Sequence, residues 1–370
     1  MARTSFLAVL GVTAALLVPG VPAQAAPVWS PMPHPATGTV RTLVAYSTTS
    51  AFATTIESCR CEENYDIQRV WRLVGETWSH FPVPTDLLPG TITGTSGTDT
   101  WFFGPLVRPD ELGSRAFHWD GQRWTEHALG IRGFRIADAT TLATNDIWVS
   151  GSYNPGYDRR EDQAAVGHWN GSSWTVTVLP RPTGTTTALS AIHGRTAADV
   201  WAAGDVCTPF ETGNARCQAF VMRWNGTGWT RVTVPSSSPR SALPTAVVVG
   251  AGEVWFAARE TDLTTRVEPD RVYAMRWHGT GWTRTYLPDG TDDGLYTNVT
   301  SLAYHSTGLL AGLTNTANEG VVRFTGQTWE AVPGPATRTP TVTDLARLPS
   351  GEVLASGRAT NPFLARLSSS

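Results

Sequence analysis

The hexapeptide WDGQRW (119–124) decides the fold, because close copies of it recur along the chain. The copies are LVGETW (73–78), WNGSSW (169–174), WNGTGW (224–229), WHGTGW (277–282) and FTGQTW (324–329). Their final tryptophans, together with Trp29 near the N-terminus, follow one another at intervals of 46 to 55 residues. Self-similarity at such a period is the signature of a repeat architecture. These seven marker tryptophans therefore divide the chain into seven repeats.

The chemistry of the hexapeptide predicts a tight β-hairpin. Asp-Gly and Asn-Gly accept the positive φ angles that a two-residue turn between twisted antiparallel strands requires. The aromatic residues on either side of the turn should then face each other across the two strands. A second element recurs before each hairpin, as a turn followed by a small apolar strand, for example TDTWFFG (98–104), NDIWVSG (145–151) and ADVWAAG (198–204). Each repeat thus offers four short strands, which indicates an all-β protein.

The two ends of the chain predict how the repeats are assembled. The C-terminal segment FLARLSSS (363–370) resembles a third strand that stops before its turn and tryptophan. The N-terminal segment APVWSP (26–31) supplies a fourth strand that has no turn before it. Pairing of these two segments would complete one unit and leave only short protected edges. We therefore expect a seven-bladed β-propeller of four-stranded antiparallel blades, closed by pairing of the N-terminal strand with the C-terminal strands.

The N-terminus and the composition indicate where the protein works. Residues 1–25 are predicted to be a signal peptide, with Arg3 as the positive residue, an apolar core and a small-residue cleavage site at 23–25. Residues 26–370 would form the propeller domain. We expect the protein to be secreted and extracellular, because a signal peptide directs export and no later stretch approaches the roughly 20 apolar residues of a membrane span. We also expect it to be a monomer. All 28 basic residues are arginine, which indicates a GC-rich bacterial genome. The net charge of −3 gives no reason to expect nucleic acid as a partner.

The four cysteines fall into two local groups. Cys207 and Cys217 bracket a polar segment, so a disulfide between them would close the base of a long loop. Cys59 and Cys61 form a C-x-C pair, which is tight for a disulfide. Cross-pairing between the groups, a redox pair and a soft-metal clip remain open alternatives. No second cysteine pair or histidine pair at zinc-binding spacing accompanies them, and we expect neither a metal nor a cofactor.

The hairpin motifs HWDGQRW (118–124), HWNGSSW (168–174) and RWNGTGW (223–229) resemble the repeats of secreted bacterial propellers of the kelch and galactose-oxidase type. They are also similar to the Asp-box hairpin of sialidase-like propellers. Galactose oxidase activity would imply a copper site of two histidines and two tyrosines, one of them crosslinked to a cysteine. The eight histidines of this chain are dispersed, and we expect His118, His168 and His278 to have structural roles. The arginine triad, tyrosine and glutamate implied by sialidase activity do not align, so no catalytic residue is assigned.

The loops between the second and third strands are where function is expected, because loops carry the binding residues of a repeated scaffold. Five of them are long and charged, at 57–66, 105–114, 152–163, 205–217 and 259–270. Aromatic side chains with nearby arginines could form a platform for sugars or peptides. The candidate ligand-binding residues are Arg108, Asp110, Tyr153, Tyr157, Arg159, Arg160 and Phe210.

These loops leave three functional hypotheses. The first is a non-catalytic propeller that binds a glycan or a protein through the loops of one face. The second is a polysaccharide hydrolase or lyase, in which a pair of loop carboxylates would act as acid and base. The carboxylates available for that role are Glu62, Glu63, Asp110, Glu111, Glu161 and Asp162. The third is a structural protein associated with the cell envelope. The sequence contains no catalytic constellation, which favours the first hypothesis.

Overall fold

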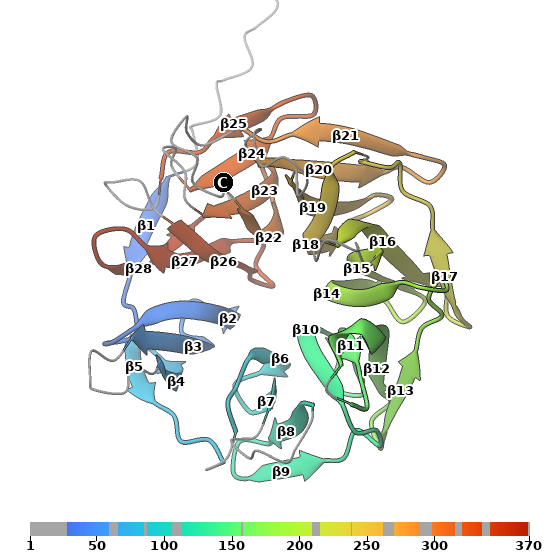
Figure 1. Cartoon of the computed structure of the whole chain (residues 1–370). Helices are drawn as coiled ribbons and strands as arrows, with labels where there is room; N and C mark the ends of the chain where they lie inside the picture. Colours follow the sequence, from blue (N-terminus) through green and yellow to red (C-terminus); the bar gives the residue numbers. More distant parts are fainter. Residues whose placement is uncertain are drawn as a thin grey trace, which may run out of the picture.

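Seven four-stranded antiparallel sheets stand around a common centre in the computed structural model (Figure 1). The structure describes residues 28–58, 66–84, 87–105, 113–156, 158–208, 215–237, 239–261, 270–288, 298–314, 320–334 and 341–368. The predicted signal peptide lies outside these residues. Within the described residues, the helical content is the 3₁₀ turn η1 (Arg159–Glu161), and no helix is long and apolar enough to cross a membrane.

Each blade contains four consecutive strands, except that the seventh takes its outer strand from the N-terminus. The first blade is β2 (Thr39–Ser47), β3 (Ser50–Ser58), β4 (Asp66–Val74) and β5 (Thr77–His80), the second is β6 (Thr91–Ser96), β7 (Asp99–Gly104), β8 (Arg115–Trp119) and β9 (Trp124–His127), and the third is β10 (Phe134–Ala143), β11 (Asp146–Tyr153), β12 (Gln163–Trp169) and β13 (Trp174–Val178). The fourth blade is β14 (Thr186–Thr196), β15 (Asp199–Thr208), β16 (Arg216–Trp224) and β17 (Trp229–Val232), and the fifth is β18 (Ser241–Val249), β19 (Val254–Thr261), β20 (Arg271–Trp277) and β21 (Trp282–Tyr286). The sixth blade is β22 (Asn298–His305), β23 (Gly308–Thr314), β24 (Val321–Phe324) and β25 (Trp329–Ala331), and the seventh is β26 (Thr341–Arg347), β27 (Val353–Arg358), β28 (Pro362–Leu367) and β1 (Trp29–Met32).

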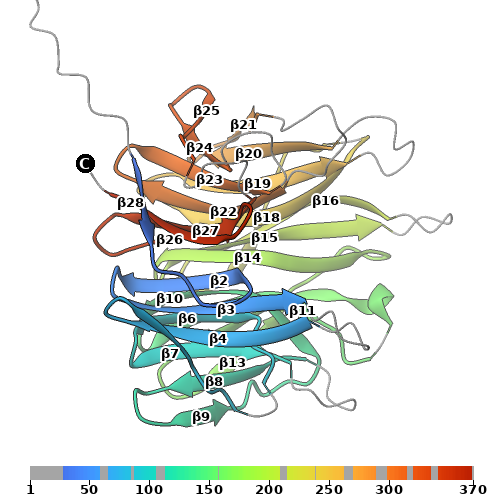
Figure 2. The ribbon, with the colours of Figure 1, turned by 90° about the vertical axis from the view of Figure 1, so that its left-hand side faces the viewer.

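The seventh blade confirms the predicted ring closure. Strand β1 pairs antiparallel with β28, with Trp29 opposite Leu367 and Met32 opposite Leu364. Strand β28 pairs in turn with β27. Strand β1 begins and strand β28 ends on the same side of the ring, which is on the left in Figure 2. That side carries the turns between first and second strands and between third and fourth strands, and we call it the hairpin face. The opposite side, where second strands end and third strands begin, is the loop face.

The hairpins adopt the turn that their sequence predicts. In the third blade Gly171 has a φ of 93°, and a Cβ added to it would lie 2.8 Å from the Cβ of Asn145. The side-chain oxygen of Asn170 accepts the backbone N–H groups of Ser172 and Ser173, both at 3.0 Å. Two features therefore require glycine at this position: the positive φ angle and the close approach of the neighbouring turn.

The marker tryptophans form the contacts between blades. Four of them pack against the tryptophan near the start of the apolar second strand of the preceding blade. The ring-centroid distances are 5.4 Å for Trp174 and Trp101, 5.7 Å for Trp229 and Trp148, 6.3 Å for Trp282 and Trp201, and 6.1 Å for Trp329 and Trp255. Aromatic contacts of this kind add to the free energy of burying the rings. The repeated motif is therefore scaffold, and it links each of these blades to the next.

A ring of hydrogen bonds joins the seven first strands around the centre. Most of these strands contain a β-bulge near their loop-face end, which turns a polar group towards the next blade. Following the chain, the bonds are Thr42 Oγ1 to Gly90 O (3.1 Å), Thr91 Oγ1 to Ala137 O (3.2 Å), Ile192 N to Asp138 Oδ2 (2.8 Å), Ser190 Oγ to Pro244 O (2.6 Å), Thr245 Oγ1 to Val299 O (2.6 Å), Thr300 Oγ1 to Val342 O (3.1 Å) and Leu43 N to Asp344 Oδ2 (2.8 Å).

Candidate functional site

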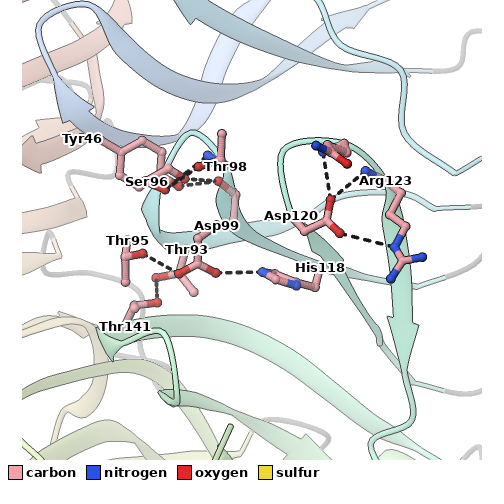
Figure 3. A network of polar contacts seen from close by, with 12 residues as sticks. Tyr46, Thr93, Thr95, Ser96, Thr98, Asp99, His118, Asp120, Arg123 and Thr141 are labelled. Atoms are coloured by element: carbon pink, nitrogen blue, oxygen red, sulfur yellow. Dashed lines mark hydrogen bonds and ion pairs between the residues drawn. The ribbon is translucent and has the colours of Figure 1, made fainter. Parts of the chain in front are cut away.

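A central channel of about 1060 Å³ runs between the first strands of all seven blades. Its wall is made mostly of small apolar and hydroxyl side chains. The hydroxyls of Thr93 on β6 and Thr141 on β10 lie 2.9 Å apart and point towards each other in Figure 3. Among the described residues, the titratable side chains that line the channel are Arg41, Asp138, His193, Arg195, Glu253, Tyr304, Asp344 and Arg347.

Two carboxylates, Asp138 of the third blade and Asp344 of the seventh, line this channel. Burial, together with the negative charge of Asp344, raises the pKa of Asp138 to about 7. Burial likewise raises the pKa of Asp344 to about 6. Both carboxylates also link blades, because they accept the N–H groups of Ile192 and Leu43 in the next blade. They therefore combine a structural role with a position on the channel wall.

The loop face of the third blade is held by a polar network. Asp162 Oδ1 accepts hydrogen bonds from Arg135 Nη2 at 2.7 Å and from Asn154 Nδ2 at 2.6 Å. Asn154 also donates to the backbone oxygen of Asp158, at 2.6 Å. Arg181 Nη1 donates to the backbone oxygen of Thr185 at 2.7 Å and contacts that of Asp162 at 3.4 Å. This network fixes the connection between β11 and β12 and occupies the carboxylate of Asp162.

A second polar network lies near the loop face of the fifth blade. The buried Glu260 accepts hydrogen bonds from Arg284 Nη1 at 2.8 Å and from the Tyr286 hydroxyl at 3.3 Å. The guanidinium of Arg284 lies 4.5 Å from the ring centroid of the buried Tyr273. The Tyr286 side chain is 48% exposed, which is unusual for a large hydrophobic residue in this protein. Its ring is therefore held in place while one side remains open to solvent.

The structure places only part of the predicted binding set. Tyr153 is the half-buried last residue of β11, and Arg160 is exposed in η1 on the connection that follows. Arg159 belongs to the same 3₁₀ turn. Arg108, Asp110, Tyr157 and Phe210 lie outside the described residues. Of the acidic residues considered for catalysis, Glu161 is exposed and Asp162 is hydrogen-bonded as above, whereas Glu62, Glu63 and Glu111 also lie outside.

The predicted disulfide between Cys207 and Cys217 is present. One detail differs from the expectation that these cysteines lie in loops: they are directly paired residues of β15 and β16, because the ladder extends to Thr208 and Arg216. The carboxylate of Asp205 lies 2.9 Å from Cys207 Sγ, and burial raises its pKa to about 6. These three side chains could hold a metal ion only after reduction, since the sulfurs are bonded to each other. Cys59 and Cys61 lie outside the described residues.

His118 and His168 next to the hairpins have structural partners, as expected, whereas His278 is exposed in its turn and its structural role stays a prediction. His118 Nε2 lies 2.7 Å from Asp99 Oδ1 (Figure 3). The imidazole also stacks on Trp101, with ring centroids 4.8 Å apart. His168 repeats the arrangement with Asp146 and Trp148. Arginine replaces histidine in the fourth and fifth blades, where Arg223 and Arg276 lie over the corresponding tryptophans. An acidic residue and a tryptophan of the second strand therefore contact a histidine or arginine of the third strand, and this contact is repeated in several blades.

The channel residues were missed by sequence reasoning that searched only the loops. A signal was available in the first strands. Asp138 and Asp344 stand where the aligned strands of other blades carry Ala191, Ala246 and Ser301. A carboxylate that interrupts an otherwise apolar or hydroxyl position in two of the repeats is the pattern that points to the channel.

The comparisons with known proteins support the fold. The sequence matches no protein-family model and no curated protein sequence. Among solved structures, the chain is similar to YCF48 bound to D1 peptide, with a TM-score of 0.56 and 12% identity over 95% of this chain and 100% of that one. It is also similar to the β-propeller domain of the Trilobed protease from Pyrococcus furiosus, with a TM-score of 0.56 and 7% identity over 90% of this chain and 96% of that one. At such identities the likeness concerns the propeller fold alone.

Proposed function

We propose that this protein is a secreted, non-catalytic propeller that binds a polypeptide segment through its loop face. The observation that carries the proposal is the fixed network around Asp162. Its hydrogen bonds to Arg135 and Asn154 order the connection between β11 and β12, while Arg160 on that connection stays exposed. A binding surface that is ordered before the ligand arrives loses less conformational entropy on binding.

The chemistry of the exposed groups favours a polypeptide ligand. Tyr286 and Arg160 offer an aromatic ring and a guanidinium, and both residue types are enriched where protein interfaces have most of their binding energy. The arginine side chain of Arg160 is 86% exposed, and its ion pair with Asp158 is long, at 3.8 Å. It can therefore be redirected to a ligand at little cost. The structural neighbour YCF48, which was solved with a bound peptide, gives a precedent on the same fold.

The test uses the mature chain, a library of C-terminally amidated peptides and a glycan array. We expect peptide ligands to be recovered, and Arg160→Ala to weaken their binding about tenfold, equivalent to about 1.4 kcal/mol. Arg123→Ala is the matched control, because Arg123 is 82% exposed and pairs with Asp120 at 3.4 Å on the hairpin face. Its effect should stay below about twofold. Recovery of glycans alone would overturn the choice of polypeptide, and recovery of neither would overturn ligand binding.

A second candidate, a polysaccharide hydrolase, is supported by Asp138 and Asp344. Two carboxylates from different blades line one channel, and the pKa of Asp138 near 7 is suited to a general acid. The candidate ranks second because both carboxylates already accept backbone N–H groups from neighbouring blades. Release of reducing sugar from a polysaccharide panel by the natural chain, with loss of that activity in Asp138→Asn, would place it first. Activity that is absent, or equal in both chains, would remove it.

A further inference from the structure

Three nitrogen-bearing side chains gather towards the hairpin-face end of the central channel. His193 and Arg195 lie near the end of β14, and Arg347 is the last residue of β26 in the seventh blade. All three line the channel. The charge of Arg347 affects the ionisation of His193, so these two side chains lie within electrostatic reach of each other, and Arg195 follows His193 by two residues on β14. This end lies opposite the loop face, so whatever it binds is independent of the function proposed above.

His193 is fixed as a neutral hydrogen-bond donor. Its Nδ1 atom accepts the backbone N–H of Val249 at 3.2 Å. Burial, together with the positive charge of Arg347, lowers the pKa of the imidazole to about 4. At neutral pH the ring therefore carries its single proton on Nε2. None of the described residues accepts a hydrogen bond from that nitrogen.

The two arginines keep most of their donors available. Arg347 Nε donates to the backbone oxygen of Tyr304 at 2.9 Å, which orients the guanidinium while leaving its terminal nitrogens without an ion pair among the described residues. Arg195 is exposed, and no carboxylate in the described part of the chain pairs with it. A guanidinium that is held by one nitrogen can present the others in the geometry that suits a carboxylate or phosphate.

The acidic residues near this end already have partners. Glu253 accepts hydrogen bonds from Arg276 Nε at 2.6 Å and from the Tyr304 hydroxyl at 3.0 Å. Glu352 accepts one from Ser350 Oγ at 2.9 Å and lies 3.8 Å from Arg366 Nε. Deeper in the channel, Asp138 and Asp344 accept backbone N–H groups. No carboxylate among these is left to neutralise Arg195 and Arg347.

We infer that His193, Arg195 and Arg347 form a binding site for an oxyanion at the hairpin-face mouth of the channel. The site offers donors and two positive charges, and its one imidazole acceptor is already occupied by Val249. Such a set recognises the oxygens of a carboxylate, sulfate or phosphate group. The group can belong to a free inorganic ion or to the end of a larger molecule that enters the channel, and both sources share the chemistry of the site.

The experiment titrates the mature chain with inorganic phosphate, sulfate and acetate, and with a short neutral peptide prepared with a free C-terminal carboxylate or as its amide. Binding is measured by calorimetry and by the ¹⁵N resonances of the His193 ring. We expect at least one oxyanion to bind and to shift the Nε2 resonance, and the amide to bind at least about tenfold more weakly than the carboxylate. Arg195→Ala, which removes no described contact, and Arg347→Ala should each weaken binding about fivefold or more. These reductions correspond to about 1 kcal/mol or more.

Arg123→Ala is the control, because Arg123 is an exposed arginine on the same face but outside the channel. Sulfate and phosphate stabilise many proteins without binding to a site, so equal responses in Arg195→Ala, Arg123→Ala and the natural chain would overturn the inference. An unshifted His193 resonance in every titration would also overturn it. Preference for phosphate or sulfate would assign the site to an inorganic ion, and preference for the free peptide carboxylate to the end of a chain.

Discussion

Replacing Asp138 by asparagine should flatten the pH dependence of stability between pH 5 and pH 7. The pKa of this carboxyl rises from 3.8 to about 7 on folding, chiefly because the group is buried in the channel wall, and the negative charge of Asp344 acts in the same direction. A group whose pKa is raised by folding contributes stability that is fully present below its unfolded pKa and is lost as pH rises through its folded pKa. Asp138 should therefore contribute a loss of stability across this window.

The linkage relation gives the size of this loss. One proton held by the folded chain and not by the unfolded chain changes stability by about 1.4 kcal/mol per pH unit. Over two pH units, with allowance for screening by water in the channel, Asp138 accounts for about 1–2 kcal/mol. Asp138→Asn removes this part of the slope, whereas the contributions of Asp344, Asp205 and the histidines remain in both chains.

Urea denaturation at pH 5, 6 and 7, followed by tryptophan fluorescence, measures the two slopes. Asp120→Asn is the control, because the same turn position holds Asn170 and Asn225 in the next two blades. The hydrogen bonds from the backbone of Arg123 and Gln122 hold the pKa of Asp120 below its usual range, so it stays ionised throughout the window. Equal slopes in the natural chain and in Asp138→Asn would refute the placement of this carboxylate in a buried channel wall.

Three further tests of the scaffold use urea denaturation. Trp174→Ala should lower the free energy of unfolding by about 3–5 kcal/mol, because it empties a contact between two blades; a loss below about 1 kcal/mol would contradict that packing. Gly171→Ala should cost more than about 1 kcal/mol, and more than Gly184→Ala, whose added Cβ meets nothing within 4 Å; the reverse order would contradict the turn geometry. The double change Cys207→Ala and Cys217→Ala should cost about 2–3 kcal/mol, and no change would show that the disulfide leaves the stability of the fold unaltered.

Local chemistry explains why the sequence predicted the architecture. The turn of WNGSSW is determined by its own residues, since Asn170 caps the turn and Gly171 supplies the positive φ. Ring closure followed from strand order alone: the missing fourth strand of the last repeat had to be the one that contains Trp29. Neither inference required knowledge of distant contacts, which is why both could be made before the structure was known.

The channel could not be predicted in the same way. A strand alternates its side chains between two faces, and a bulge shifts that alternation by one residue. The bulge between Ile136 and Asp138, and its counterpart before Asp344, therefore decide which side chains face the centre. Whether His193 and Arg347 lie near each other also depends on two blades that are far apart in sequence. On the loop face, the partners of Asp162 likewise come from separate strands, so its structural role could not be predicted from the loop sequence.

Hydrogen exchange of the mature chain, with and without an amidated peptide recovered from the library, tests the proposed function most directly. We predict that the peptide slows exchange in the connection between β11 and β12, at residues 154–162, and leaves the hairpin turns at 119–124 and 169–174 unchanged. Protection confined to those hairpin turns would contradict binding through the loop face.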